Sequence, residues 1–303
     1  SLGNVIAPED ILKKYGADIL RIWVASSNYS EDLRIDYSIL DQHADSYRKI
    51  RNTFRYLLGN IKDNLEIVDL KKIDYQKLPE LEQLMLHKLY CINSNFQKYF
   101  ENYDFHNLYK ELLNFCTVDL SAFYFDIRKD SLYCDPIDSE KRKATIVLLN
   151  IILNSLLKWF APILSFTTEE IFRLLFKNKK SIHLEKFLRF PEEFKNEKLS
   201  EKWKELIKIR NVCNISIEEK RASKEIGSSL EAELKIEINK TLKDVTKNID
   251  FSELCITSKA NVIFVDDEET VAFTNKAKGT KCPVCWKISE LPCKKHSSSE
   301  HSK

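Results

Sequence analysis

The chain has 303 residues and a mass of 35.6 kDa, which exceeds the usual domain size of about 100 to 200 residues. Hydrophobic residues make up 43% and charged residues 31%, so the composition excludes a wholly disordered chain. The net charge of +2 excludes a polycation that binds nucleic acid along its whole length. Neither GxGxxG nor GxxxxGK[ST] occurs among only five glycines, which excludes a glycine-rich phosphate cradle.

Helical patterns dominate the first 190 residues. Pro8 and Gly16 bracket a short first helix, and a second helix follows through Ile19 and Val24. Apolar residues at three-to-four spacing then predict long helices, and Thr167 with Glu170 predicts a capping box for one more. The long predicted helices cover residues 36–63, 81–100, 105–133 and 141–161.

The most apolar segment runs from Ile146 to Leu164. Asn150, Asn154 and Lys158 recur in it at i, i+4 and i+8, which predicts a buried helix with one solvent-exposed edge rather than a membrane span. We therefore expect no membrane partner. Since no export signal opens the chain, we expect a cytoplasmic protein whose eight cysteines are reduced or bind metal.

The hydrophobic pattern changes beyond residue 190. Residues 230–238 alternate apolar and charged side chains, which is typical of a half-buried strand. Shorter apolar runs at 254–256, 261–265 and 270–273 are candidates for further strands around a helix near 240–249. These residues predict a small α/β unit after the helices. We expect the last residues, 297–303, to form a frayed tail because they contain no apolar side chain.

The most specific chemical motif is a set of four metal-ligand residues near the C-terminus. Cys282, Cys285, Cys293 and His296 form CxxC, seven residues, then CxxH. Four such ligands in two close pairs favour one tetrahedral, structural Zn²⁺ ion, since no open coordination position is left for catalysis. The alternative is a cluster of reduced thiols without metal.

The region around this motif is basic. Residues 271–303 contain seven Lys and two Glu, a local net charge of +5, which is typical of a nucleic-acid contact. Trp286 could either stack on a base or pack beside the metal motif. The candidate RNA-binding residues here are Lys281, Trp286, Lys287 and Lys294.

A second candidate RNA contact is a row of arginines. Arg48, Arg51 and Arg55 recur at i, i+3 and i+7, so a helix could present all three to a phosphate backbone. The alternative is an ordinary solvated helix face, since Asp41 and Asp45 precede the arginines on the same predicted helix and dilute their charge. The remaining cysteines (91, 116, 134, 213, 255) and histidines (43, 87, 106, 183) are dispersed, and packing is the simplest interpretation of each. No catalytic residues can be assembled.

Several ordered segments resemble the bacterial isoleucyl-tRNA synthetase family. Ser1-Leu2-Gly3-Asn4-Val5 looks like the end of a KMSKS signature, of which only the last Ser is present, and Tyr15–Trp23 and Arg51–Asn60 resemble the segments that follow it. Similar matches continue through nearly the whole chain. They include Asn114–Tyr124, Ala161–Glu170 and Ile226–Glu231.

The resemblance implies a mainly α fold: a class Ia anticodon-binding helical bundle, then a small α/β unit and a C-terminal zinc knuckle. The implied boundaries are 1–35 for the end of the catalytic core and connector, 36–190 for the helical domain, 191–275 for the α/β junction domain and 276–303 for the knuckle and tail. The family commonly ends its zinc site with a second CxxC, whereas His296 stands here. Imidazole can replace thiolate in tetrahedral geometry.

The resemblance also implies a function. In the intact enzyme, isoleucine is attached to tRNA(Ile) with ATP and Mg²⁺, and the HIGH motif, nucleotide fold and editing domain lie upstream. We expect this chain to bind tRNA as a monomer beside those upstream catalytic and editing domains, and to be inactive by itself. The alternatives are a freestanding tRNA-binding or interaction module and a valyl-tRNA synthetase relative.

Overall fold

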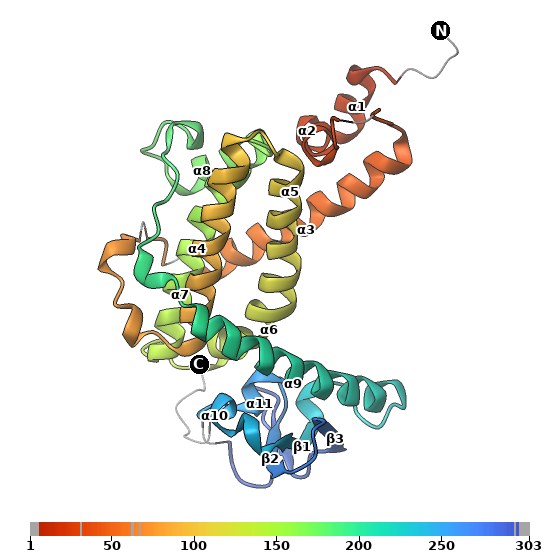
Figure 1. Ribbon diagram of the computed structural model, residues 1–303, viewed down its shortest axis with the longest axis vertical. Helices are drawn as coiled ribbons and strands as arrows, with labels where there is room; N and C mark the ends of the chain where they lie inside the picture. Colours follow the sequence, from red (N-terminus) through yellow and green to blue (C-terminus); the bar gives the residue numbers. More distant parts are fainter. Residues whose placement is uncertain (1–5, 31, 62–63, 67, 294, 297–303) are drawn as a thin grey trace. The chain divides into compact units, whose positions relative to one another are not determined.

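The computed structural model describes residues 6–30, 32–61, 64–66, 68–293 and 295–296 (Figure 1). The chain forms two compact units. The first unit combines Ser1–Tyr124 with Lys143–Lys195, and the second combines Phe125–Arg142 with Asn196–Lys303. The second unit thus contains a segment from within the predicted helical domain.

The first unit is helical and follows most of the predicted pattern. Aromatic rings fill its core: Phe96 lies 6.2 Å from Trp159, and Phe54 lies 6.2 Å from Phe160, between ring centroids. Its α-helices are α1(Pro8–Tyr15), α2(Ala17–Ser26), α3(Tyr37–Ile61), α4(Glu80–Glu101), α5(Phe105–Asn114), most of α7(Glu140–Phe160) and α8(Ser165–Leu175). Its 3-10 helices are η1(Leu70–Lys72), η2(Tyr75–Lys77), η4(Ile182–Leu184) and η5(Glu192–Phe194).

The boundary between α1 and α2 is a confirmed prediction. Pro8 is the first residue of α1, where its missing N–H costs no helical hydrogen bond. Gly16 ends the helix with φ of +85°, a conformation that glycine adopts without a steric penalty.

The predicted capping box at Thr167 and Glu170 is wrong. Helix α8 begins two residues earlier, at Ser165, so Thr167 lies inside its first turn. The buried carboxylate of Asp18, on α2, accepts hydrogen bonds from the backbone N–H groups of Phe166 (3.3 Å) and Thr167 (2.7 Å). A residue far away in sequence therefore satisfies donors that a local cap usually satisfies.

The single helix predicted over residues 105–133 is divided into three parts. Helix α5 continues into a π-helix, η3(Phe115–Phe125), and then into α6(Asp126–Cys134), which belongs to the second unit. The apolar spacing shows that this stretch is helical, but it does not reveal the wider i→i+5 turn.

Helix α7 is the core helix that the sequence predicts. Among the described residues it is the one helix long and apolar enough to cross a membrane, and 72% of its apolar window is buried inside the protein. The expected solvent-exposed edge is partly wrong, because Asn150 is buried. Its side chain accepts from the N–H of Glu66 (3.0 Å) and donates to the carbonyl of Asn64 (3.0 Å), so it fixes a loop against the helix.

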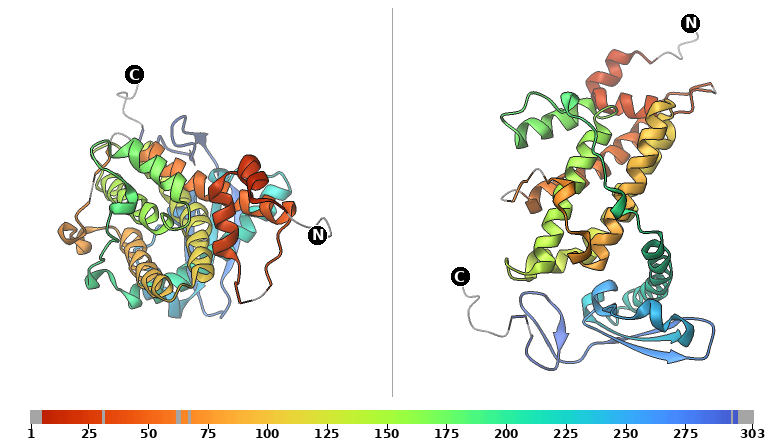
Figure 2. Two further views of the ribbon diagram at one scale, coloured as in Figure 1. Left: turned by 90° about the horizontal axis from the view of Figure 1, so that it is seen from above. Right: turned by 60° about the vertical axis from the view of Figure 1, so that its left-hand side comes forward.

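The second unit is built around a three-stranded sheet of order β2-β1-β3, whose strands are labelled in Figure 1 and which Figure 2 shows from two further sides. Strand β1 pairs in parallel with β2 and antiparallel with β3, and the alternation in residues 232–238 places Leu234, Ile236 and Ile238 on the buried face. Helix α9 packs against β1 and β3. The elements are α6, α9(Glu197–Ala222), η6(Ser229–Glu231), β1(Ala232–Asn239), η7(Lys240–Leu242), α10(Lys243–Thr246), α11(Phe251–Leu254), β2(Lys259–Val265), β3(Val271–Lys276), β4(Thr280–Lys281) and β5(Ile288–Ser289).

One predicted strand in this unit is wrong. Residue 254 is the last residue of the short helix α11, and residues 255 and 256 follow it. Asp250 caps this helix by accepting hydrogen bonds from the N–H groups of Ser252 (2.8 Å) and Glu253 (3.2 Å). A short apolar run does not distinguish a strand from a buried helical turn. The helix expected near 240–249 is present only as η7 and the four-residue α10.

Candidate metal centre and RNA-binding residues

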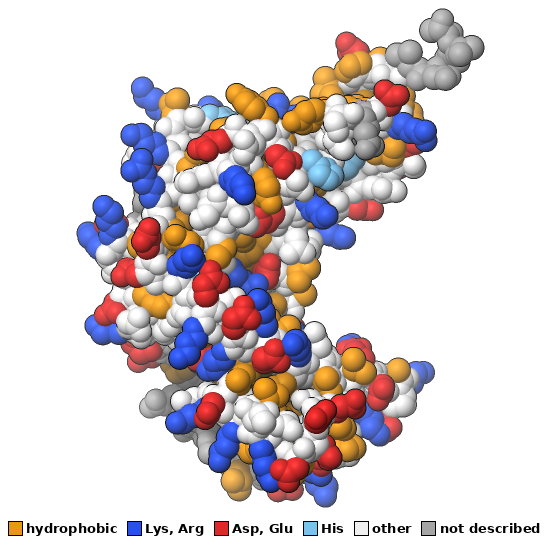
Figure 3. Space-filling view, in the orientation of Figure 1, with side chains coloured by type: hydrophobic (Ala, Val, Ile, Leu, Met, Phe, Trp, Pro, Cys, Tyr) orange, Lys and Arg blue, Asp and Glu red, His pale blue; other side chains and the backbone are white. Residues whose placement is uncertain are grey.

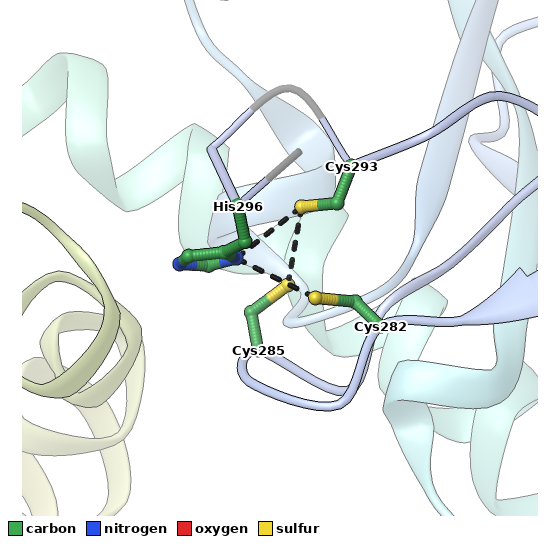
Figure 4. Close-up of side chains that lie close together, drawn as sticks. All are labelled: Cys282, Cys285, Cys293 and His296. Atoms are coloured by element: carbon green, nitrogen blue, oxygen red, sulfur yellow. Dashed lines mark hydrogen bonds between the residues drawn. The ribbon is translucent and has the colours of Figure 1, made fainter. Parts of the chain in front are cut away.

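The four predicted ligand residues come together in the second unit. The donor atoms of Cys282, Cys285, Cys293 and His296 all lie within 4.8 Å of one another (Figure 4). Sγ of Cys285 and Sγ of Cys293 are 3.7 Å apart, and Nδ1 of His296 lies 3.5 Å from Sγ of Cys282 and 3.3 Å from Sγ of Cys293.

A two-stranded hairpin, β4 and β5, forms the frame of this cluster. The N–H of Cys282 donates to the carbonyl of Lys287 (2.9 Å), and the N–H of Trp286 donates to the carbonyl of Cys282 (3.1 Å). The turn between the first two cysteines therefore brings both thiols to the same cluster. Gly279 enters the hairpin with φ of +118°, and a Cβ there would lie 2.2 Å from the carbonyl of Ser289.

The local environment gives the thiols of Cys282 and Cys285 different pKa values. Burial by itself would raise the pKa of the Cys282 thiol, but hydrogen bonds from the backbone N–H groups of Cys285 and Val284 lower it to about 6. Burial raises the pKa of Cys285 to about 12, and the neighbouring thiols of Cys282 and Cys293 act in the same direction. Of these two thiols, Cys282 thus ionises more readily. A bound cation would also favour ionisation of Cys285.

The donor set is compatible with one tetrahedral zinc ion. A Zn–S bond of about 2.3 Å places two tetrahedral thiolates about 3.8 Å apart, close to the 3.7 Å between the sulfurs of Cys285 and Cys293. The imidazole also presents the correct nitrogen. Nε2 of His296 lies 2.9 Å from the carbonyl of Cys134, which can only accept, so the neutral imidazole carries its proton on Nε2 and has its lone pair on Nδ1.

The lysines and Trp286 around the cluster have different environments. Lys281 is exposed, with its ammonium 5.7 Å from the ring centre of Trp286, and Lys287 is half-buried. Trp286 is 59% exposed, so it does not pack as the core of the knuckle. Lys294 lies outside the described residues.

Lys295 has a role that the sequence did not reveal. Its Nζ lies 2.8 Å from Oδ2 of Asp130 and 2.6 Å from Oδ1 of Asp135. The local net positive charge around the cluster is therefore lower than the sequence count suggests, because Lys295 is paired with these two carboxylates. Only the tertiary structure brings these carboxylates, which are distant in sequence, to the lysine.

The arginine row lies on α3 in the first unit, as predicted. Arg48, Arg51 and Arg55 are all exposed, and Arg48 forms an ion pair with Asp45. Acidic and basic side chains are interspersed over the face of this unit seen in Figure 3. The guanidinium groups are thus accessible, but part of their charge is neutralised locally.

The isolated cysteines and histidines have varied surroundings. Cys116, Cys213 and Cys255 are buried, whereas Cys91 and Cys134 are only partly buried. His87 is buried with a ring nitrogen 3.7 Å from Sγ of Cys91. The other three predicted packing histidines lie beside Ser26 or the carbonyl of Ser165: His43, His106 and His183. Ser1, the residue resembling the end of KMSKS, lies outside the described residues.

Comparison with known families agrees with the helical architecture. Residues 82–238, from α4 to β1, match the family described as the anticodon-binding domain of tRNA ligase. The chain belongs to this family. In addition, residues 1–36 match the class I tRNA synthetases for I, L, M and V.

Individual relatives of the chain are isoleucine–tRNA ligases. The chain is 69% identical over 297 residues to the isoleucine–tRNA ligase of Pelagibacter ubique, and the match covers 98% of this chain and 33% of the relative. The chain is 40% identical over 301 residues to the enzyme of Bartonella henselae, a match that covers 96% of this chain and 31% of the relative. It is 41% identical over 302 residues to the enzyme of Agrobacterium fabrum, a match that covers 95% of this chain and 30% of the relative. The chain thus spans about a third of the length of these relatives and is homologous to their C-terminal region.

Proposed function

We propose that this chain is the tRNA-binding region of an isoleucine–tRNA ligase, which attaches isoleucine to tRNA(Ile) with ATP and Mg²⁺. The anticodon-binding match over residues 82–238 is the observation that carries the proposal. The 69% identity to an isoleucine–tRNA ligase supports isoleucine over valine as the amino acid. This function fits a cytoplasmic monomer whose partners are tRNA(Ile) and the catalytic and editing domains of the same polypeptide.

The RNA contact proposed for the first unit is the exposed face of α3. Three guanidinium groups along one helix can each neutralise a phosphate and release counterions, so binding should weaken as salt increases. Log K should change with log salt by about −0.7 to −0.9 per phosphate contact. In the second unit we propose that Lys281, Trp286, Lys287 and Lys294 contact RNA.

Binding of tRNA(Ile) and tRNA(Val) to the 303-residue chain, titrated at several salt concentrations, tests this function. We expect tighter binding of tRNA(Ile), and replacement of Arg48, Arg51 and Arg55 by Ala should weaken binding and make the salt dependence shallower. A matched control removes three cations from α9 instead: Lys204, Lys208 and Arg221, each paired with a glutamate. Equal binding of both tRNAs would favour a freestanding module, and equal effects of the two triple variants would reject the arginine row.

We further propose that one structural Zn²⁺ ion is bound by Cys282, Cys285, Cys293 and His296. Zinc would replace the thiol protons and join the two ends of a segment that has few buried apolar residues of its own. Metal analysis of the purified chain should give about one zinc per chain, and Cys285→Ser should lose it. Zinc content that is unchanged in this variant would reject the four-ligand assignment.

A further inference from the structure

The last predicted ligand is held by a helix outside the knuckle. Lys295, the residue before His296, is bound between Asp130 (2.8 Å) and Asp135 (2.6 Å), which lie on α6 and just after its end. The side chain of Asp135 is only 9% exposed and that of Asp130 is 22% exposed. Water screens these ion pairs less than it screens a typical surface pair.

The same helix end orients the imidazole ring. The last carbonyls of a helix lack partners within the helix, and the carbonyl of Cys134, the last residue of α6, accepts from Nε2–H of His296 at 2.9 Å. Sγ of Cys134 also lies 3.9 Å from the carbonyl of Val284, inside the first CxxC turn. The end of α6 thus contacts both halves of the metal motif.

Helix α6 is itself firmly anchored in the second unit. The buried guanidinium of Arg128 lies 2.6 Å from a carboxylate oxygen of Glu253, on α11, and Nζ of Lys141 lies 2.8 Å from the other oxygen. These contacts fix both ends of the segment that contains Asp130 and Asp135. A fixed support is what a ligand needs when its own chain segment is short.

We propose that Asp130, Asp135 and the carbonyl of Cys134 form a latch that holds Lys295 and His296 so that Nδ1 of His296 completes the metal site. The inference rests on the proposed zinc site and names the positioning residues that act on it. A thiolate in the fourth position would have no N–H to donate, so the carbonyl contact is specific for histidine at this position. Metal affinity should therefore depend on side chains that do not touch the metal.

Metal titration of the 303-residue chain tests the latch. Co²⁺ serves as the spectroscopic probe, and Zn²⁺ affinity is measured by competition with a chelator. Asp130→Asn with Asp135→Asn should weaken Zn²⁺ binding by about 10- to 100-fold, and Lys295→Met should do the same while Lys295→Arg keeps most of the affinity. Adding Lys295→Met to the double variant should cause little further loss, because all three side chains act through one contact.

Asp138→Asn is the matched control, since it removes an exposed carboxylate from the same segment. Affinity within twofold of wild type in the Asp130/Asp135 double variant, or an equal loss in Asp138→Asn, would overturn the latch while the zinc site itself stands. Failure of the unaltered chain to bind either metal would instead reject the proposed site, and the latch with it.

A second measurement needs no variant. Two-bond ¹H–¹⁵N spectra of the zinc-loaded chain should show His296 protonated at Nε2 and bound to metal through Nδ1, with a slowly exchanging Nε2 proton. Metal bound through Nε2 would overturn the carbonyl contact, whatever the variants do to folding.

Discussion

Replacement of Asp18 by Ala should selectively destabilise the start of α8. The carboxylate of Asp18 is 7% exposed and accepts from the N–H of Thr167 (2.7 Å) and from its hydroxyl (2.6 Å), besides the N–H of Phe166. A buried donor left without a partner costs about 1 to 3 kcal/mol, and loss of a helix cap costs about 1 kcal/mol. The hydroxyl of Thr167 keeps its contact with Tyr47 at 2.9 Å.

We therefore expect Asp18→Ala to lower the free energy of unfolding of the first unit by about 3 kcal/mol, and Asp18→Asn, which keeps one acceptor oxygen, by about half of that. Hydrogen exchange at the N–H groups of residues 166–168, together with urea unfolding, measures the change. Asp10→Ala is the control, because it removes an exposed carboxylate from the first turn of α1. If Asp18→Ala changed stability by no more than this control, the distant cap would be refuted.

Three other replacements have distinct expected outcomes. Gly279→Ala should lower Zn²⁺ affinity without changing helix content, since its Cβ would clash with the carbonyl of Ser289; unchanged metal affinity would contradict the clash. Trp286→Gly should retain zinc, because φ of +63° suits glycine, but weaken tRNA binding by about 1 to 3 kcal/mol; equal tRNA affinity would exclude stacking. Burial raises the pKa of Tyr109 from 10.0 to about 12, so the folded state holds this proton more tightly and loses stability as pH rises through that interval. Tyr109→Phe should lack this loss, and a stability difference from wild type that is the same at pH 8 and pH 11 would contradict it.

The metal cluster shows how much could be predicted from local sequence. All four ligands lie within 15 consecutive residues, 282–296, so their spacing already limits how far apart the donor atoms can lie. The same holds for α1, where Pro8 and Gly16 determine the boundaries through their own backbone preferences. The long helices α3, α4 and α7 could likewise be predicted from the sequence, because their apolar residues recur at helical spacing.

The sequence by itself thus determined most helices of the first unit, the strand at 232–238 and which side chains could bind a metal, because each of these depends on residues close together in the chain. It did not predict the long helix α9 of the second unit. The tertiary structure alone decided that Asp18 caps α8, that α6 packs in the second unit and that Asp130 and Asp135 hold Lys295. The physical reason is that a carboxylate, a lysine or a carbonyl can pair with many partners of similar chemistry. Which partner it meets depends on packing between distant segments, and local periodicity contains no information about that choice.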